Sequence, residues 1–208
     1  MKDNVVTFPK VTVILRGYSY EECRCVVGCL VGSRIGSVEI AMNTSGAGRI
    51  IDGLTSEFGE EIMIGAGTVV TPERAKTAIN AGSKFLLSPV CFTDEIFDIA
   101  RDAGVLTVPA GFSPTEIYTM LEKGADIVKV FPAARVGPKY FSDIQGPLDA
   151  LPLMAVGGVN AENAQEYFDG GATYVGIGSG IFNPADIRAM NIDEIGRQIR
   201  IFEEKIRW

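Results

Sequence analysis

The chain has 208 residues, of which 47% are apolar and 22% are charged, and its net charge is −7. This composition is that of an ordinary globular protein with enough apolar residues for a full core. The negative charge argues against a broad nucleic-acid surface, although a local cluster of backbone N–H groups can still bind a small anion. The chain contains no histidine, which excludes Ser-His and Cys-His catalysis and the commonest metal ligand.

No segment approaches the ~18 consecutive apolar residues of a membrane span, and residues 1–6 lack the apolar core of a signal peptide. We therefore expect a cytoplasmic protein that binds neither membranes nor nucleic acid. The four cysteines are Cys23, Cys25, Cys29 and Cys91. Cys25 and Cys29 have the spacing of metal ligands on a helix, but no other ligand type is nearby, so reduced, packed thiols are the better interpretation.

Apolar, β-branched segments alternate with helical segments along the chain. The expected strands are 11–17, 37–43, 62–68, 84–89, 105–111, 127–132, 153–158 and 173–179. Helix starts carry capping residues: Ser19 is followed three residues later by Glu22, and Thr71 precedes a proline. Glycines at the expected helix ends are Gly82, Gly104, Gly124 and Gly171. Residues 192–207 are expected to form a closing helix.

Strands that alternate with helices form βαβ units with a parallel sheet. Eight expected strands and about eight helices predict an α/β fold of the closed (β/α)₈ type, a TIM barrel. An open doubly wound sheet is the main alternative, but no G-x-G-x-x-G segment follows the first strand. No linker rich in Pro, Gly or Ser interrupts the pattern, so we expect a single barrel domain over residues 1–208.

The active site of such a barrel lies at the carboxyl ends of its strands. Polar residues near these expected ends are Arg16, Glu39, Asn43, Thr68, Ser88, Ser113, Lys129 and Ser179. Lys129 is the most informative because its neighbours in the strand are apolar. A buried ammonium is costly, so it is paired, extends to solvent or loses its proton. A neutral lysine attacks carbonyl carbons through a Schiff base; a purely structural lysine is the alternative.

Glu39 and Arg16 also lie within apolar runs. Burial raises the pKa of a carboxyl group, which suits Glu39 to general acid–base catalysis. The alternative for Glu39 is a structural ion pair with Lys129 or Arg16. Arginine is always charged and binds carboxylates through two hydrogen bonds. Near Lys129, Arg16 would bind an acid substrate and lower the pKa of the lysine by repulsion.

Glycines follow the last two expected strands, at Gly157-Gly158 and at Gly178-Ser179-Gly180. Glycine lets the backbone approach a ligand closely, and the corresponding loops of barrels often bind phosphate. Tight turns without any ligand are the alternative. The segment 65–68, Gly-Ala-Gly-Thr, also ends a strand, and its glycines are expected to make room for a ligand.

Taken in order, several segments resemble one family. They are Val38-Glu39-Ile40, Gly65-Ala-Gly-Thr-Val69, Ser88-Pro89, Lys129-Val-Phe-Pro132, Val156-Gly-Gly-Val159 and Gly178-Ser179. They resemble the class I aldolases that cleave 2-keto-3-deoxy-6-phospho sugar acids of the phosphogluconate and phosphogalactonate types, the first of which also acts on 4-hydroxy-2-oxoglutarate. The resemblance extends from about Val11 to Phe182.

The resemblance implies a homotrimer of barrels without metal or other cofactor, acting on a phosphorylated sugar acid to release pyruvate. It implies that Lys129 forms the Schiff base and that Glu39 is the acid–base carboxylate. Thr68 would hold the pyruvoyl carboxylate together with an arginine. The residues implied for the phosphate are Gly157, Gly158, Gly178 and Ser179. Those expected to bind the rest of the substrate are Arg16, Asn43, Ser88, Phe131 and Val156.

Three positions separate this chain from the phosphogluconate type. Asn43 replaces an arginine that binds the carboxylate in that type, and the resemblance implies that Arg16, which is typical of the phosphogalactonate type, supplies the charge instead. Val156 replaces a threonine and is also the phosphogalactonate residue. Ala110 replaces a glycine that both types share, and it leaves the natural substrate open.

Two other classes remain as alternatives. A sugar-phosphate isomerase or epimerase would keep the glycine clusters without needing Lys129 in a strand. A catalytically silent phosphate-binding barrel stays open as an alternative because of the changes at Asn43 and Ala110.

Overall fold

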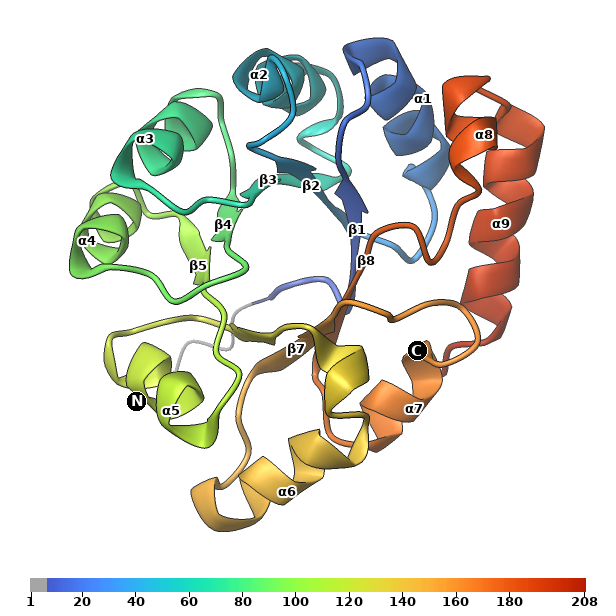
Figure 1. Ribbon diagram of the computed structural model, residues 1–208. Coiled ribbons are helices and arrows are strands. Elements are labelled where there is room, and N and C mark those ends of the chain that lie inside the picture. The colour runs from blue at the N-terminus through green and yellow to red at the C-terminus, as the bar shows by residue number, and fades with distance from the viewer. Residues whose placement is uncertain (1–6) are drawn as a thin grey trace.

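Eight parallel strands form one sheet in the computed structural model, which describes residues 7–208. Their order in the sheet is β5-β4-β3-β2-β1-β8-β7-β6, and they enclose a central space in Figure 1. Their bounds are β1 Val11–Leu15, β2 Ser37–Ala41, β3 Met63–Gly67, β4 Phe85–Leu87, β5 Leu106–Val108, β6 Val128–Val130, β7 Leu153–Val156 and β8 Tyr174–Ile177. The expectation for residues 1–6 lies outside the described residues.

The sheet closes between β5 and β6, its first and last strands. The N–H of Ile127 donates to the carbonyl of Thr107 at 3.2 Å, and the N–H of Lys129 donates to the carbonyl of Pro109 at 2.8 Å. The carboxylate of Asp126 reinforces this seam by accepting from the N–H of Thr107 at 2.8 Å. The closed (β/α)₈ barrel is confirmed, and the open doubly wound alternative is wrong.

Helices surround the strands as an outer layer (Figure 1). Their bounds are α1 Tyr20–Leu30, α2 Ala47–Phe58, α3 Pro72–Asn80, α4 Asp94–Asp102, α5 Pro114–Glu122, the 3₁₀ helix η1 Ala133–Arg135, α6 Lys139–Leu148, α7 Ala164–Asp169, α8 Pro184–Arg188 and α9 Ile192–Glu204. Ser19 and Glu22 form the expected capping box at α1. The glycines expected at helix ends adopt positive φ, for example +90° at Gly82 and +104° at Gly171. None of the helices within residues 7–208 is long and apolar enough to cross a membrane.

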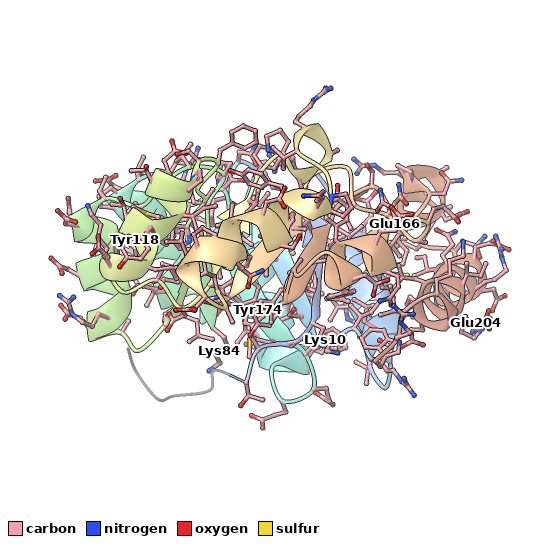
Figure 2. All side chains as sticks on the ribbon, turned by 90° about the horizontal axis from the view of Figure 1, so that it is seen from below. Lys10, Lys84, Tyr118, Glu166, Tyr174 and Glu204 are labelled. Atoms are coloured by element: carbon pink, nitrogen blue, oxygen red, sulfur yellow. The ribbon has the colours of Figure 1, made fainter. Side chains whose placement is uncertain are left out.

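Alternating strand residues build two apolar cores. The larger core lies between the sheet and the helices and contains residues such as Val13, Val38 and Ile64. The smaller core fills the interior of the barrel around Phe8, Phe85, Leu87, Val108, Ile127, Met154 and Val156. Figure 2 shows Lys10, Lys84 and Tyr174, which stand at the starts of strands, together at one end of the barrel. The carboxyl ends of the strands are therefore at the opposite end.

Strands β4, β5 and β6 are shorter than expected, with three residues each. Each strand is followed within two residues by a proline, namely Pro89, Pro109 and Pro132. Proline has no N–H to donate to a neighbouring strand, so each proline interrupts the regular ladder, which resumes after Pro109 at the Ala110–Lys129 bridge.

The four cysteines are free thiols. Three of them lie on α1 as expected, where Cys23 is buried. Burial raises the pKa of Cys23 to about 12, so this thiol is inert. The expectation of a packed thiol is wrong for Cys91, which is exposed because it lies in the loop between β4 and α4.

Candidate active site

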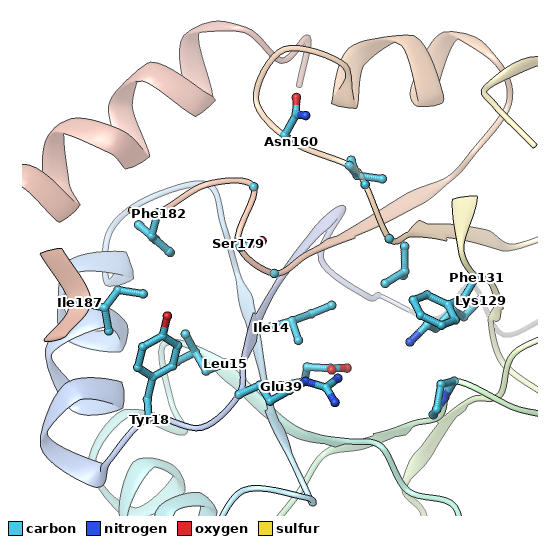
Figure 3. Close-up of a pocket in the computed structure, with 18 residues that line it drawn as sticks. Ile14, Leu15, Tyr18, Glu39, Lys129, Phe131, Asn160, Ser179, Phe182 and Ile187 are labelled. Atoms are coloured by element: carbon cyan, nitrogen blue, oxygen red, sulfur yellow. The ribbon is translucent and has the colours of Figure 1, made fainter. Parts of the chain in front are cut away.

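A cavity of about 670 Å³ opens at the carboxyl ends of the strands. Nine of the residues predicted for the site line it: Arg16, Glu39, Lys129, Phe131, Val156, Gly157, Gly158, Gly178 and Ser179. In Figure 3, Lys129 and Phe131 stand at one side, Tyr18, Phe182 and Ile187 at the other, and Glu39 and Ile14 between them. The cavity therefore contains both the predicted catalytic residues and the residues predicted to bind the phosphate.

Lys129 points into the barrel because its neighbours in β6, Val128 and Val130, belong to the outer core. Its side chain does not extend to solvent, since only 5% of the residue is exposed. Its Nζ lies 4.7 Å from the ring centre of Phe131. Burial lowers the pKa of Lys129, Glu39 opposes this effect, and the Arg16 guanidinium lowers the pKa further. The environment favours the neutral, nucleophilic amine.

Glu39 lies on β2 and is 1% exposed. Its carboxylate occupies the space left by a missing side chain on β3, because a Cβ on Gly67 would lie 2.1 Å from Glu39 Oε1. The ring of Phe85 occupies the corresponding space at Gly65, 2.4 Å from an added Cβ. The expectation that these two glycines make room for a ligand is therefore wrong. They make room for a catalytic candidate and for the inner core.

The Glu39 carboxylate is poorly satisfied. Its Oε2 is buried and has no hydrogen-bond partner among residues 7–208. Burial raises the pKa of Glu39, while Lys129 and Arg16 act in the opposite direction. Within the described part of the chain, Lys129 and Glu39 form no ion pair at 4.0 Å or less. The structural ion pair considered for Glu39 is thus absent there, and both groups keep their polar atoms available to a ligand.

Arg16 and Asn43 act together at the cavity rim. Both residues are exposed at the ends of β1 and β2, and Arg16 Nη1 donates to Asn43 Oδ1 at 3.3 Å. Asn43 is not part of the cavity lining among the described residues. It contacts the arginine that is, and the geometry makes Asn43 a support for Arg16.

Two other predicted residues lie outside the cavity lining. Ser88 is fully buried, and its hydroxyl accepts from the N–H of Val90 at 3.2 Å, a local turn contact. Thr68 has a φ of +56°, which is unusual for a β-branched residue. Its carbonyl accepts from Arg74 Nη1 at 3.0 Å. Ala110, at the position that distinguishes this chain from both types, bridges to Lys129 across the closing seam.

The glycines after β7 and β8 form one wall of the cavity. Gly157 and Gly158 adopt φ of +92° and +82°, and a Cβ on Gly158 would lie 2.4 Å from Ala134 Cβ. A Cβ on Gly180 would lie 2.3 Å from the carbonyl of Val159, so the two loops pack directly against each other. Their backbone can reach a ligand that no bulkier sequence would admit.

Several lining residues were not singled out in the sequence: Ile14, Leu15, Tyr18, Asn160, Phe182 and Ile187. Tyr18 follows the β1 end by three residues and Asn160 follows the glycine pair after β7, so position alone could have indicated both. Phe182 and Ile187 belong to the segment around α8, whose five residues are too short for a helical pattern. No cluster of three or more His, Cys, Asp or Glu that could hold a metal occurs within residues 7–208.

A buried, unpaired lysine and carboxylate beside a glycine-lined pocket agree with the family model that matches this sequence. The model described as KDPG and KHG aldolase matches residues 3–198. The chain belongs to this family. It is a class I aldolase, a lyase that breaks a carbon–carbon bond.

Individual relatives agree with this assignment. The aldolase is 28% identical to the 2-dehydro-3-deoxy-6-phosphogalactonate aldolase of Escherichia coli, over 93% of this chain and 94% of that protein. It is 33% identical to a probable 2-dehydro-3-deoxy-6-phosphogalactonate aldolase of Rhizobium meliloti, over 82% and 81%. The crystal structure of a KDPG aldolase from Legionella pneumophila, with pyruvate captured as a covalent carbinolamine, matches with a TM-score of 0.83 and 27% identity, covering 92% of each chain.

Proposed function

We propose that this aldolase cleaves a 2-keto-3-deoxy-6-phospho sugar acid to pyruvate and glyceraldehyde 3-phosphate, with Lys129 as the Schiff-base nucleophile and Glu39 as the acid–base group. The observation that carries the proposal is the burial of both groups in one cavity without an ion pair between them in residues 7–208. An isomerase or epimerase would leave this lysine without a role.

The first steps use the neutral amine. Nζ of Lys129 attacks the C2 keto carbon to form a carbinolamine, and loss of water gives the iminium. The positive iminium replaces a neutral amine, so it withdraws electrons from C3 and favours bond cleavage. Phe131, whose ring lies 4.7 Å from Nζ, stabilises this cation through its π face.

Glu39 then takes part in two proton transfers. Its carboxylate removes the proton of the C4 hydroxyl, and the C3–C4 bond breaks. The electrons of that bond form the C2–C3 double bond, and the iminium becomes a neutral enamine. The aldehyde leaves as glyceraldehyde 3-phosphate. The protonated Glu39 returns the proton to C3, and water hydrolyses the new iminium to release pyruvate and Lys129. A carboxyl whose pKa is raised by burial alternates readily between these two states.

The two charged ends of the substrate bind at separate places. Arg16, held by Asn43, supplies the positive charge for the carboxylate. Thr68 supports this carboxylate through its N–H and hydroxyl, neither of which forms a hydrogen bond within residues 7–208. The phosphate binds to the wall of Gly157, Gly158, Gly178 and Ser179.

Val156 supports a preference for the phosphogalactonate epimer over the phosphogluconate one. Its side chain lines the cavity and offers no hydrogen bond to a C4 hydroxyl. A hydroxyl left unpaired in the site costs roughly 1–3 kcal/mol. We expect Val156→Thr to shift the ratio of kcat/KM for the two epimers toward the gluconate, and an unchanged ratio would show that another residue sets the choice.

The assembly and location extend the same proposal. We propose a cytoplasmic homotrimer, as the family resemblance implies. Val90 and Phe112 support an association surface because they are 52% and 43% exposed in the isolated chain. Analytical ultracentrifugation distinguishes a trimer from a monomer.

Reduction of the Schiff base tests the proposed function. Incubation with pyruvate and borohydride should add one three-carbon unit to each chain, and a tryptic map should place it on Lys129. Lys129→Met should remove the adduct, whereas Lys123→Met, at an exposed lysine paired with Asp94, should not. An adduct on another lysine, or none, would overturn the proposal.

A further inference from the structure

The end of the cavity farthest from Lys129 contains one side-chain hydroxyl without an assigned role. Tyr18 lines the cavity three residues beyond β1. Figure 3 shows its hydroxyl directed into the cavity, on the side where Phe182 and Ser179 lie. Within residues 7–208, this hydroxyl has no hydrogen-bond partner. Tyr18 is half-buried, so its hydroxyl remains open to a partner from the cavity.

The side chains beside Tyr18 do not supply that partner. Leu15, Phe182 and Ile187 line the same end of the cavity and are apolar. Asn160, at the mouth of the neighbouring loop, uses its Oδ1 to accept from the N–H groups of Glu162 and Asn163 at 2.8 and 3.2 Å. The acceptor for the Tyr18 hydroxyl must therefore come from a ligand or from water.

Arg188 of α8 fixes the ring of Tyr18 in this position. Its guanidinium lies 4.5 Å from the ring centre. The same guanidinium donates to Glu22 Oε2 and to the carbonyl of Gly17, both at 2.7 Å. These three contacts of Arg188, all with residues 17–22, hold Tyr18 between α8 and the start of α1.

The surroundings of Tyr18 favour the protonated hydroxyl. Burial raises the pKa of Tyr18, Arg188 opposes this, and Glu22 and Cys23 add to it. The hydroxyl therefore keeps its proton at neutral pH and donates it. The cation on the ring face strengthens that donation. Arg16, by contrast, is at the end of the cavity beside Glu39 and Lys129, and its charge lowers the pKa of both.

We propose that the Tyr18 hydroxyl donates a hydrogen bond to the phosphoryl group of the substrate, next to Ser179, and that Arg188 is a positioning residue that holds the ring for this contact. The inference rests on the proposed function and adds a side-chain donor to a phosphate site otherwise built of backbone and one serine. The ligand class is a phosphomonoester of a short polyol or aldehyde.

Binding of sn-glycerol 3-phosphate, measured by calorimetry, tests this contact without any chemistry. Tyr18→Phe should raise the Kd about tenfold, as expected for loss of one hydrogen bond to a charged group. Tyr20→Phe is the matched control, because the Tyr20 hydroxyl donates to Glu57 at 3.2 Å and lies outside the cavity. An unchanged Kd in Tyr18→Phe, or no binding by the parent, overturns the proposal.

Kinetics separate the two roles. In the condensation of pyruvate with an aldehyde, Tyr18→Phe should lower kcat/KM about tenfold for glyceraldehyde 3-phosphate, mainly through KM, and less than about twofold for glyceraldehyde. Arg188→Met should cause a smaller loss with the same selectivity and add little to Tyr18→Phe, because both act through one contact. Equal losses for both aldehydes would make Tyr18 a structural residue.

Pyruvate trapping distinguishes a failure of the Tyr18 contact from a failure of the aldolase mechanism. A Tyr18→Phe protein that traps pyruvate on Lys129 and keeps its phosphate selectivity refutes the role of Tyr18 and leaves the aldolase mechanism intact. A parent that binds glycerol 3-phosphate through Tyr18 but traps no pyruvate refutes the mechanism and leaves the phosphate contact.

Discussion

Within residues 7–208, buried polar groups are hydrogen-bonded to each other at one end of the barrel interior and lack such partners at the other end. At the amino ends of the strands, Thr12 Oγ1 and Ser37 Oγ share a hydrogen bond of 2.9 Å, and Ser37 also donates to the carbonyl of Val11 at 3.1 Å. Below them, the ring of Phe8 packs edge-on against Phe85 at 5.1 Å. At the carboxyl ends, Lys129 and Glu39 are buried without an ion pair in the described residues.

This difference teaches which buried polar groups serve stability and which serve chemistry. Buried polar groups in proteins are normally paired, and the amino end follows that rule. Ionisable groups that stay unpaired inside a cavity are instead candidates for catalysis. A missing partner alone is insufficient, because the hydroxyls of Thr55 and Ser83 also lack one within residues 7–208. These hydroxyls are neutral and do not line the cavity.

The largest expected effect comes from removing the carboxylate at the carboxyl end. Glu39→Gln should keep pyruvate trapping on Lys129 but lose about 10²–10⁴ in kcat, the usual contribution of a positioned acid–base group. Glu60→Gln, at an exposed carboxylate near the amino end, is the control. Turnover within about threefold of the parent would make Glu39 structural and erase the proposed contrast.

A smaller effect is expected at the rim. Arg16→Met should raise the pyruvate concentration for half-maximal trapping roughly ten- to a hundredfold, because a charge-assisted hydrogen bond contributes about 1.5–3 kcal/mol. Asn43→Ala should do much less, since Asn43 contacts the arginine through one bond of 3.3 Å. The reverse order would place the carboxylate at β2 and leave Arg16 as a surface residue.

The two glycines of β3 allow the catalytic end and the inner core of the barrel to be compared by one substitution, glycine to alanine. Gly67→Ala pushes the Glu39 carboxylate aside, while Gly65→Ala pushes into the packed ring of Phe85. We expect Gly65→Ala to lower the free energy of unfolding by about 1–3 kcal/mol through overpacking. Gly67→Ala should lower kcat with a smaller change in stability, because a carboxylate can rotate. Denaturant unfolding and steady-state kinetics on both variants measure this crossover, which equal profiles would contradict.

The smallest effect on activity is expected at the amino end. Thr12→Val removes one paired hydroxyl while preserving the shape of the side chain. It should lower the free energy of unfolding by about 0.5–1.5 kcal/mol and change kcat/KM by less than about twofold. A larger kinetic loss would mean that the amino end influences the chemistry directly.

Much of this arrangement is predictable from the sequence. The barrel follows from alternating strands and helices, and Lys129 and Glu39 are recognisable because each is a charge inside an apolar run. Glycines after β7 and β8 indicate by their position alone the wall of the cavity where we propose that the phosphate binds.

The remaining features depend on which residues from distant segments meet. Glu39 occupies the space that Gly67 leaves because of the register between β2 and β3, in which Ala41 lies opposite Gly67. No local sequence pattern specifies this register. The support of Arg16 by Asn43 joins the ends of two strands. Tyr18 gains its position from Arg188, 170 positions away in a helix of five residues.

We infer that burial lowers the pKa of Lys129 at the carboxyl ends of the strands. The pH dependence of pyruvate trapping with cyanoborohydride tests it most directly, because only the neutral amine attacks the keto carbon. We predict a midpoint below the usual lysine value of 10.5. The midpoint should be higher in Arg16→Met, which loses a like charge, and lower in Glu39→Gln, which loses an attractive charge. A midpoint near 10.5 in the parent, unmoved by either substitution, would contradict this inference.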